Sequence, residues 1–168
     1  MTFDVPAEVE VNGQVRITVR MESQFEAVLG SRARSGEQFA IWEATYGPVG
    51  PDGYPAELWD LRSGHIDRSV ADYFRAHDYD LRDYLERNWT TLGPKLHGQI
   101  HVFAGDMDTF YLNLAVYRLE EFLARARPAA DAEFVYGRPM KPHGWQPWTN
   151  AELMRIMARH MEQRRPRR

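Results

Sequence analysis

The residues best suited to chemistry are an acidic loop at 105–109 (Gly-Asp-Met-Asp-Thr) and a histidine loop at 142–145 (Pro-His-Gly-Trp). Each loop follows a short apolar run, as a loop does at the end of a buried strand. A carboxylate bonded to an imidazole fixes the tautomer of the ring and stabilises the imidazolium that forms when the ring takes a proton from a nucleophile. The spacing therefore predicts that Asp108 and His143 form an acid–base pair of a nucleophilic hydrolysis site.

The same residues also have ordinary structural roles. An aspartate between a strand and a helix is often only the N-cap of that helix, and Asp106, Asp108 and Thr109 all suit that position. A histidine in a loop rich in proline, glycine and tryptophan can simply bond to backbone groups. From spacing alone, both interpretations of Asp108 and His143 stay open.

Parallel strands are needed to bring the two loops together. Residues 99–104 form a β-branched apolar run that predicts one buried strand, and residues 132–136 predict a second. Helical periodicity predicts a helix over 109–126, and a Thr-x-x-Glu capping box at 149–152 predicts the start of a last helix. This order predicts a βαβα unit with both loops at one sheet edge. Two parallel strands are an incomplete sheet, so more sheet is expected upstream.

Residues 1–94 have a different, mostly helical character. The predicted elements are a hairpin around Asn12-Gly13, helices over 22–30 and 39–46 with a capping box at 35–38, and two helices capped by Asp67 and Asp80, the last ending at Gly93-Pro94. The predicted fold class is therefore α/β. It combines an insertion-like helical region at 1–94 with a strand-helix-strand-helix unit at 95–168, in a single domain or fragment.

Composition excludes several classes of function. The chain has 168 residues, of which 43% are hydrophobic, enough for one ordinary domain. It has no cysteine, so disulfides, thiolate zinc sites and cysteine nucleophiles are excluded. A net charge of −3 predicts no nucleic-acid or membrane partner, and the basic run at 164–168 is expected to be a solvated helix end. The first residues show no signal peptide, which predicts a cytoplasmic location if the chain is complete.

A metal site is the main rival chemistry. His97, His101, Asp106, Asp108 and His143 are suitable ligand types, but no His-x-x-x-His pattern lies on a clear helix. No glycine-rich phosphate loop follows a strand. We therefore predict neither a metal ion nor an organic cofactor.

The two loops resemble a known family. The chain resembles the esterase D/feruloyl esterase-like group of the α/β-hydrolase superfamily at four features. These are a Gly-x-x-Asp step ending at Asp108, Asn113 in the next helix, a His-x-Trp loop at His143, and Trp148 after that loop. The resemblance is best over residues 95–150 and weaker over 22–94. It implies a partial α/β-hydrolase fold and a serine-type carboxylic-ester hydrolase. Asp108 would be the triad acid and His143 the general base.

The nucleophile of that family is missing from this chain. In the family the serine lies in a Gly-x-Ser-x-Gly turn between a strand and a helix. None of the serines has that context: Ser23, Ser31, Ser35, Ser63 and Ser69. The resemblance therefore implies a C-terminal portion that supplies the aspartate and histidine and is inactive alone. A small-molecule ester would be the substrate once a nucleophile-bearing half completes the site.

Five tryptophans offer candidates for substrate binding. Trp145 and Trp148 flank the His143 loop, so we predict that they line the substrate pocket, whereas the aromatics of the helical region are expected to be core.

The alternative function, from another class, is a non-catalytic interaction or dimerisation module. An open strand edge in the βαβα unit would favour self-association. Substrate identity cannot be predicted, because the loops that form the acyl and alcohol pockets in this fold are absent.

Overall fold

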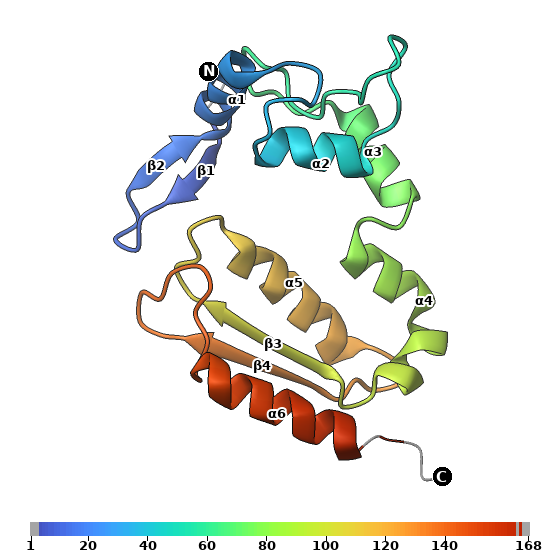
Figure 1. Ribbon diagram of the computed structural model, residues 1–168. Helices are drawn as coiled ribbons and strands as arrows, with labels where there is room; N and C mark the ends of the chain where they lie inside the picture. The colour runs from blue at the N-terminus through green and yellow to red at the C-terminus, as the bar shows by residue number, and fades with distance from the viewer. Residues whose placement is uncertain (1–3, 164, 166–168) are drawn as a thin grey trace.

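The computed structural model describes residues 4–163 and 165, and it shows a mixed α/β chain arranged in two halves (Figure 1). In chain order the elements are β1 (Pro6–Val9), β2 (Val15–Thr18), α1 (Val19–Leu29), α2 (Gln38–Tyr46), α3 (Arg68–Ala76), α4 (Leu81–Leu96), β3 (Ile100–Gly105), α5 (Leu112–Arg125), β4 (Ala132–Gly137) and α6 (Asn150–Gln163). The β1–β2 hairpin and helices α1–α3 form the first half, and α4 connects them to the second (Figure 1). The predicted α/β class is confirmed at this level. Within the described residues, no helix is long and apolar enough to cross a membrane.

The second half is the predicted strand-helix-strand-helix unit. Strands β3 and β4 pair in parallel without a register shift, from Ile100 opposite Ala132 to Gly105 opposite Gly137. Helix α5 covers one face of this pair and α6 the other (Figure 1). The Thr149 capping box is confirmed, because the Glu152 carboxylate accepts from the Thr149 amide at 2.8 Å and the Glu152 amide donates to the Thr149 hydroxyl at 3.3 Å. Because the strands are in register, the loops that follow them leave from the same edge.

The core of this half includes a residue from α4. Trp89 is buried with Phe122, Leu123 and Ala126, and its ring meets that of Phe122 edge-on at 5.5 Å. The Trp89 indole also donates to the Pro128 carbonyl at 2.7 Å. Helix α4 is therefore packed into the second half, although the sequence placed it with the helical region.

The predicted helix end at Gly93-Pro94 is wrong, since α4 continues to Leu96. Gly93 lies so close to the Trp89 indole that a Cβ there would clash with the ring. The glycine therefore serves close packing rather than termination. Pro94 falls in the last turn, where its missing N–H removes one helical hydrogen bond without preventing the turn.

The first half has its own apolar cluster and two buried carboxylates. Leu58, Trp59 and Val70 form the cluster. The predicted capping box at 35–38 is wrong: α2 begins instead under the buried carboxylate of Glu26, which accepts from the Phe39 amide at 2.7 Å and from the Ala40 amide at 2.9 Å. A carboxylate from α1 thus takes the free N–H groups at the start of α2, where a negative charge is favourable.

The other buried carboxylate, Glu43, predicts a pH dependence of stability. It accepts from the Leu58 amide at 2.7 Å, yet burial raises the pKa of the Glu43 carboxyl more than its backbone hydrogen bonds lower it. Because folding raises the pKa of the Glu43 carboxyl, the folded protein favours its protonated form. The stability associated with that form is fully present below pH 4.5, the pKa of the carboxyl in the unfolded chain, and is lost as pH rises through the pKa in the folded protein. We therefore expect the free energy of unfolding of Glu43→Gln, measured relative to that of wild type, to be higher at pH 7 than at pH 4. Urea midpoints at both pH values test this, and a constant difference would contradict it.

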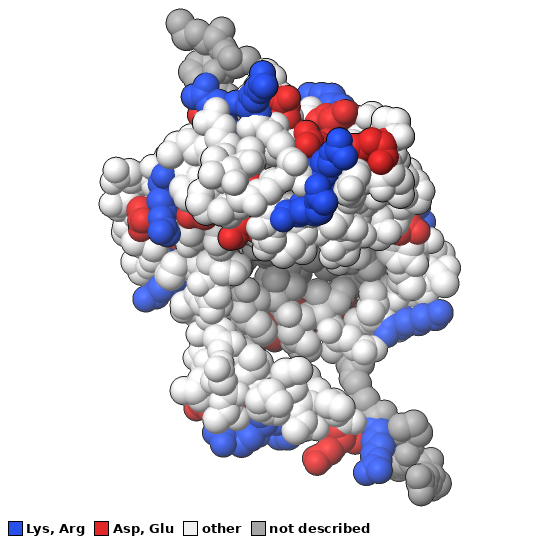
Figure 2. All heavy atoms as spheres, turned by 45° about the horizontal axis from the view of Figure 1, so that its top comes forward, with Lys and Arg blue, Asp and Glu red and all other residues white. Residues whose placement is uncertain are grey.

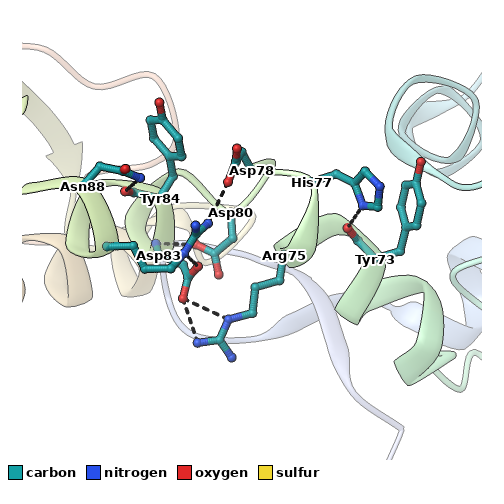
Figure 3. Close-up of polar contacts among 9 residues, drawn as sticks. Tyr73, Arg75, His77, Asp78, Asp80, Asp83, Tyr84 and Asn88 are labelled. Atoms are coloured by element: carbon teal, nitrogen blue, oxygen red, sulfur yellow. Dashed lines mark hydrogen bonds and ion pairs between the residues drawn. The ribbon is translucent and has the colours of Figure 1, made fainter.

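Charged pairs fix the junction between α3 and α4 (Figure 3). The Asp83 carboxylate accepts from Arg75 at 2.8 Å and from Arg87 at 2.7 Å, and Arg87 also pairs with Asp78. These guanidinium groups hold the pKa of the Asp83 carboxyl below its usual range, so its stabilising contribution is lost only as pH falls through that lowered value. The junction sets the direction in which α4 leaves the first half.

The predicted N-caps of α3 and α4 are confirmed. The Asp67 carboxylate accepts from the Ser69 amide, and the Asp80 carboxylate accepts from the Asp83 amide.

A second connection between the halves comes from the hairpin. Strands β1 and β2 are antiparallel around Asn12-Gly13, as predicted. The Val9 amide at the end of β1 donates to the Thr109 carbonyl at 2.9 Å, in the loop that follows β3. This contact places the hairpin beside the loop that carries Asp108.

Candidate active site at the ends of the parallel strands

The last residue of each parallel strand is a glycine that lets the loops pack closely. A Cβ at Gly105 would collide with the carbonyl oxygens of Lys141 and Pro142, just before His143. A Cβ at Gly137 would collide with the Trp145 indole. Both glycines are therefore required by close approach of the histidine loop. This gives a physical reason for the glycine in the Gly-x-x-Asp step.

Asp106 attaches the histidine loop to the acidic loop. Its carboxylate accepts from the Lys141 amide at 2.8 Å, and the Met107 amide donates to the Lys141 carbonyl at 3.0 Å. The Asn113 amide group, from the first turn of α5, donates to the Asp106 carbonyl at 3.1 Å. The sequence suggested a helix cap or a metal ligand as roles for Asp106. The structure shows that it holds the segment before His143.

The Asp108 carboxylate is buried, at 5% exposure, and its two oxygens accept from different partners. Oδ1 accepts from the Phe110 amide at 2.9 Å and from the Leu112 amide at 3.2 Å. Oδ2 lies 2.9 Å from Nδ1 of His143. Tyr111, the N-cap residue of α5, has a left-handed backbone (φ 59°) and provides no side-chain cap. Asp108 therefore satisfies the start of α5 and binds the imidazole at the same time.

The His143 ring is held at one nitrogen and open at the other. An ionised carboxylate only accepts, so Nδ1 carries the proton in the 2.9 Å contact and Nε2 of the neutral ring carries the lone pair. The ring packs edge-on against Phe110 at 5.0 Å, and 48% of the side chain is exposed. Within the described residues Nε2 has no hydrogen-bond partner. The structure thus brings the predicted acid and base together, with the basic nitrogen available.

A cavity of about 610 Å³ lies beside His143, between the two halves. Its first-half wall comes from β1, α1, α2 and the loop around Trp59; its second-half wall comes from residues 110–112, Leu114 and His143. Figure 2 shows the hollow between the halves, with few charged atoms on its visible walls. The aromatic residues Phe39, Trp42 and Trp59 line it. Trp59 also belongs to the buried cluster of the first half and Phe39 packs against that cluster, so the prediction that the aromatics of the helical region are core is confirmed for these two.

Trp145 and Trp148, predicted to line the substrate pocket, do not line this cavity. The Trp145 indole covers Gly137 at the end of β4. Trp148 packs edge-on against Phe103 at 4.8 Å, in a smaller cavity beneath α6. The loop between β4 and α6 therefore places both rings against the strand pair.

The candidate metal ligands are dispersed. His101 pairs with Glu133 across the strands at 2.8 Å, and His97 lies 3.5 Å from Asp131 at the opposite strand ends from His143. Among residues 4–163 and 165, no three His, Asp or Glu side chains gather closely enough to hold a metal ion. The 2.9 Å contact with Asp108 orients the His143 ring in a way that suits proton transfer at Nε2.

Comparisons with protein-family models, with curated proteins and with solved structures found no match for this chain.

Proposed function

We propose that this chain is the C-terminal part of a serine-type carboxylic-ester hydrolase, and that it supplies the aspartate and histidine of a Ser-Asp-His triad. The observation that carries the proposal is the 2.9 Å contact between Asp108 Oδ2 and His143 Nδ1. The two loops leave the carboxyl ends of parallel strands, where active sites of open α/β sheets form. The incomplete two-stranded sheet agrees with a partial α/β-hydrolase fold.

The geometry fits one sequence of proton transfers. Nε2 of His143 would take the proton of a hydroxyl nucleophile as its oxygen attacks the ester carbonyl carbon. Asp108 would stabilise the resulting imidazolium through the Nδ1 proton. The imidazolium would then give the Nε2 proton to the departing alkoxide, leaving an acyl-enzyme that water hydrolyses by the same two transfers.

We find no serine or threonine hydroxyl in the cavity beside His143, in the part of the chain that the structure describes. Most serine hydroxyls already donate elsewhere: Ser23 to the Val19 carbonyl, Ser35 to Glu26, Ser63 to Asp60 and Ser69 to Asp67. We therefore propose that a nucleophile-bearing half completes the site.

The isolated chain is expected to show no saturable turnover of p-nitrophenyl acetate above that of His143→Ala. The triad residues act as a unit, and loss of the nucleophile alone removes roughly 10⁶-fold of activity. Release of p-nitrophenolate, followed at matched concentrations of the two proteins, tests this. Saturable turnover that His143→Ala abolishes would place a nucleophile within the chain.

The source of the nucleophile can be tested at the gene. Reading the DNA immediately upstream of the Met1 codon is expected to show, in frame or shifted, a strand, a Gly-x-Ser-x-Gly turn and a helix. Non-coding sequence there, together with cooperative unfolding of the 168 residues, would favour the alternative function.

That alternative, a non-catalytic module that self-associates, is favoured by one observation. In the described part of the chain, β3 pairs only with β4, so each strand has an outer edge that no other strand covers. Open edges promote pairing between chains. Sedimentation velocity over a range of concentrations is expected to show reversible self-association, and a sharp monomer at every concentration would contradict it.

A further inference from the structure

Three neighbouring aromatic rings form one wall of the cavity beside His143. Phe39 lies face to face with Trp59 at a centroid distance of 3.9 Å, and Trp42 lies 6.0 Å from Trp59 and 6.2 Å from Phe39. All three line the cavity. The faces of such rings carry negative electrostatic potential and attract cations.

The charged groups on the same walls have one sign. The cavity is lined by Glu8 and Glu22, and the lining residues that the structure describes include no lysine or arginine. Glu8 lies 3.7 Å from Arg16, whereas Glu22 has no hydrogen bond or ion pair in the described part of the chain. His143 and Tyr111 are the other titratable groups on the walls, and His143 is already bonded to Asp108.

Of the two glutamates that line the cavity, Glu22 is the one whose ionised carboxylate a bound cation would stabilise more. Partial burial raises the pKa of its carboxyl, and the negative charges of Glu26, Glu8 and Glu37 raise it further. An unpaired, partly buried carboxylate beside other acidic groups is in an unfavourable position, which a bound cation would relieve.

We propose that this cavity binds an organic cation, an ammonium group with apolar substituents, between the aromatic wall of Phe39, Trp42 and Trp59 and the carboxylate of Glu22. An anion would meet the unpaired carboxylate of Glu22 and no basic side chain among the lining residues that the structure describes. A neutral apolar ligand would leave Glu22 without a partner. A bare metal ion would lack ligands, because no three suitable side chains gather among the described residues. The proposal goes beyond ester hydrolysis, and its test reads binding without turnover.

Three soluble probes with a single benzene ring separate these cases. Isothermal titration calorimetry at pH 8 and low ionic strength compares phenyltrimethylammonium, benzyl alcohol and benzenesulfonate. We expect the cation to bind at least about tenfold more tightly than the neutral alcohol, and the anion not to bind. Backbone amide shifts in NMR should be largest for the residues that line the cavity. Equal affinities for cation and alcohol, binding of the anion, or shifts outside the cavity would overturn the proposal.

Two matched variants test the carboxylate. Glu22→Gln should lower the affinity for phenyltrimethylammonium by about threefold to tenfold and leave the affinity for benzyl alcohol unchanged. Glu57→Gln is the control, because its pKa is also raised by burial and acidic neighbours but it does not line this cavity. The control should bind the cation like wild type. An equal loss of affinity for the cation in both variants, or no loss in either, would overturn the assignment of Glu22. Circular dichroism of each variant confirms that it is folded.

Discussion

Replacement of Asp108 by asparagine is expected to slow the reaction of His143 with diethylpyrocarbonate by about tenfold or more, because it reverses the tautomer of the ring. The reagent acylates an imidazole nitrogen that carries a lone pair. In the wild-type site that nitrogen is Nε2, which Asp108 keeps free by holding the proton on Nδ1. A charge-assisted hydrogen bond of roughly 1.5–3 kcal/mol corresponds to a bias of about 10- to 150-fold between the two forms.

The surroundings of residue 108 dictate how an asparagine would orient. The amides of Phe110 and Leu112 both donate toward Oδ1, so the carbonyl oxygen of the asparagine must take that side. Its NH₂ group would then face Nδ1 of His143, in the place of Oδ2. An NH₂ group can only donate, so Nδ1 becomes the acceptor and the proton moves to Nε2.

Mass spectrometry of peptides over a time course measures modification at His143. His160, in the same chain, is the internal reference, because it lies on α6 against His101 and makes no contact with Asp108 among those observed. A rate at His143 that stays within about twofold of wild type would show that the carboxylate does not control the tautomer.

The largest effect on stability is expected at Trp89. Trp89→Ala should lower the free energy of unfolding by about 3–5 kcal/mol, since it removes a large buried side chain and leaves a cavity. The ring is only 4% exposed and packs against Phe122 and Gly93. A loss of this size is a large part of the roughly 5–15 kcal/mol that stabilises an ordinary domain. Urea denaturation followed by circular dichroism measures it.

Trp89→Phe is the matched control. It keeps an aromatic ring against Phe122 but loses the hydrogen bond to the Pro128 carbonyl, which is 2.7 Å long. We expect it to lose about 1–2 kcal/mol. If Trp89→Ala cost no more than Trp89→Phe, the indole would not anchor α4 to the second half.

Local signals in the sequence predicted local structure well. The hairpin around Asn12-Gly13, the caps at Asp67 and Asp80, and the Thr149 capping box depend on residues within a few positions of one another. The parallel pairing followed from the order of elements, and it placed Asp108 beside His143.

Features that depend on distant contacts were not predictable from the sequence. Helix α2 begins under Glu26, a residue of α1, so the serine at position 35 is not its cap. A tertiary neighbour overrides the local pattern there. The helix end predicted at Gly93-Pro94 is a different case, because the neighbour that packs against Gly93 is Trp89, four residues earlier on the same helix, and α4 continues to Leu96.

The walls of the cavity depend on how the halves meet. Trp42 and Trp59 line the same cavity as His143, and α4 and the contact from Val9 to Thr109 connect the two halves that form it. Trp145 is nearer to His143 in the sequence, but its indole packs against the end of β4, where the absence of a Cβ at Gly137 leaves room for it.

The central claim is that Asp108 holds the His143 ring as a general base with Nε2 open to the cavity. Long-range ¹H–¹⁵N correlation spectra of the wild-type imidazole test it most directly, recorded at a pH where the ring is neutral. We predict a protonated Nδ1 and an unprotonated Nε2. A neutral ring protonated at Nε2 would contradict the hydrogen bond to Asp108, and with it the proposed hydrolase site.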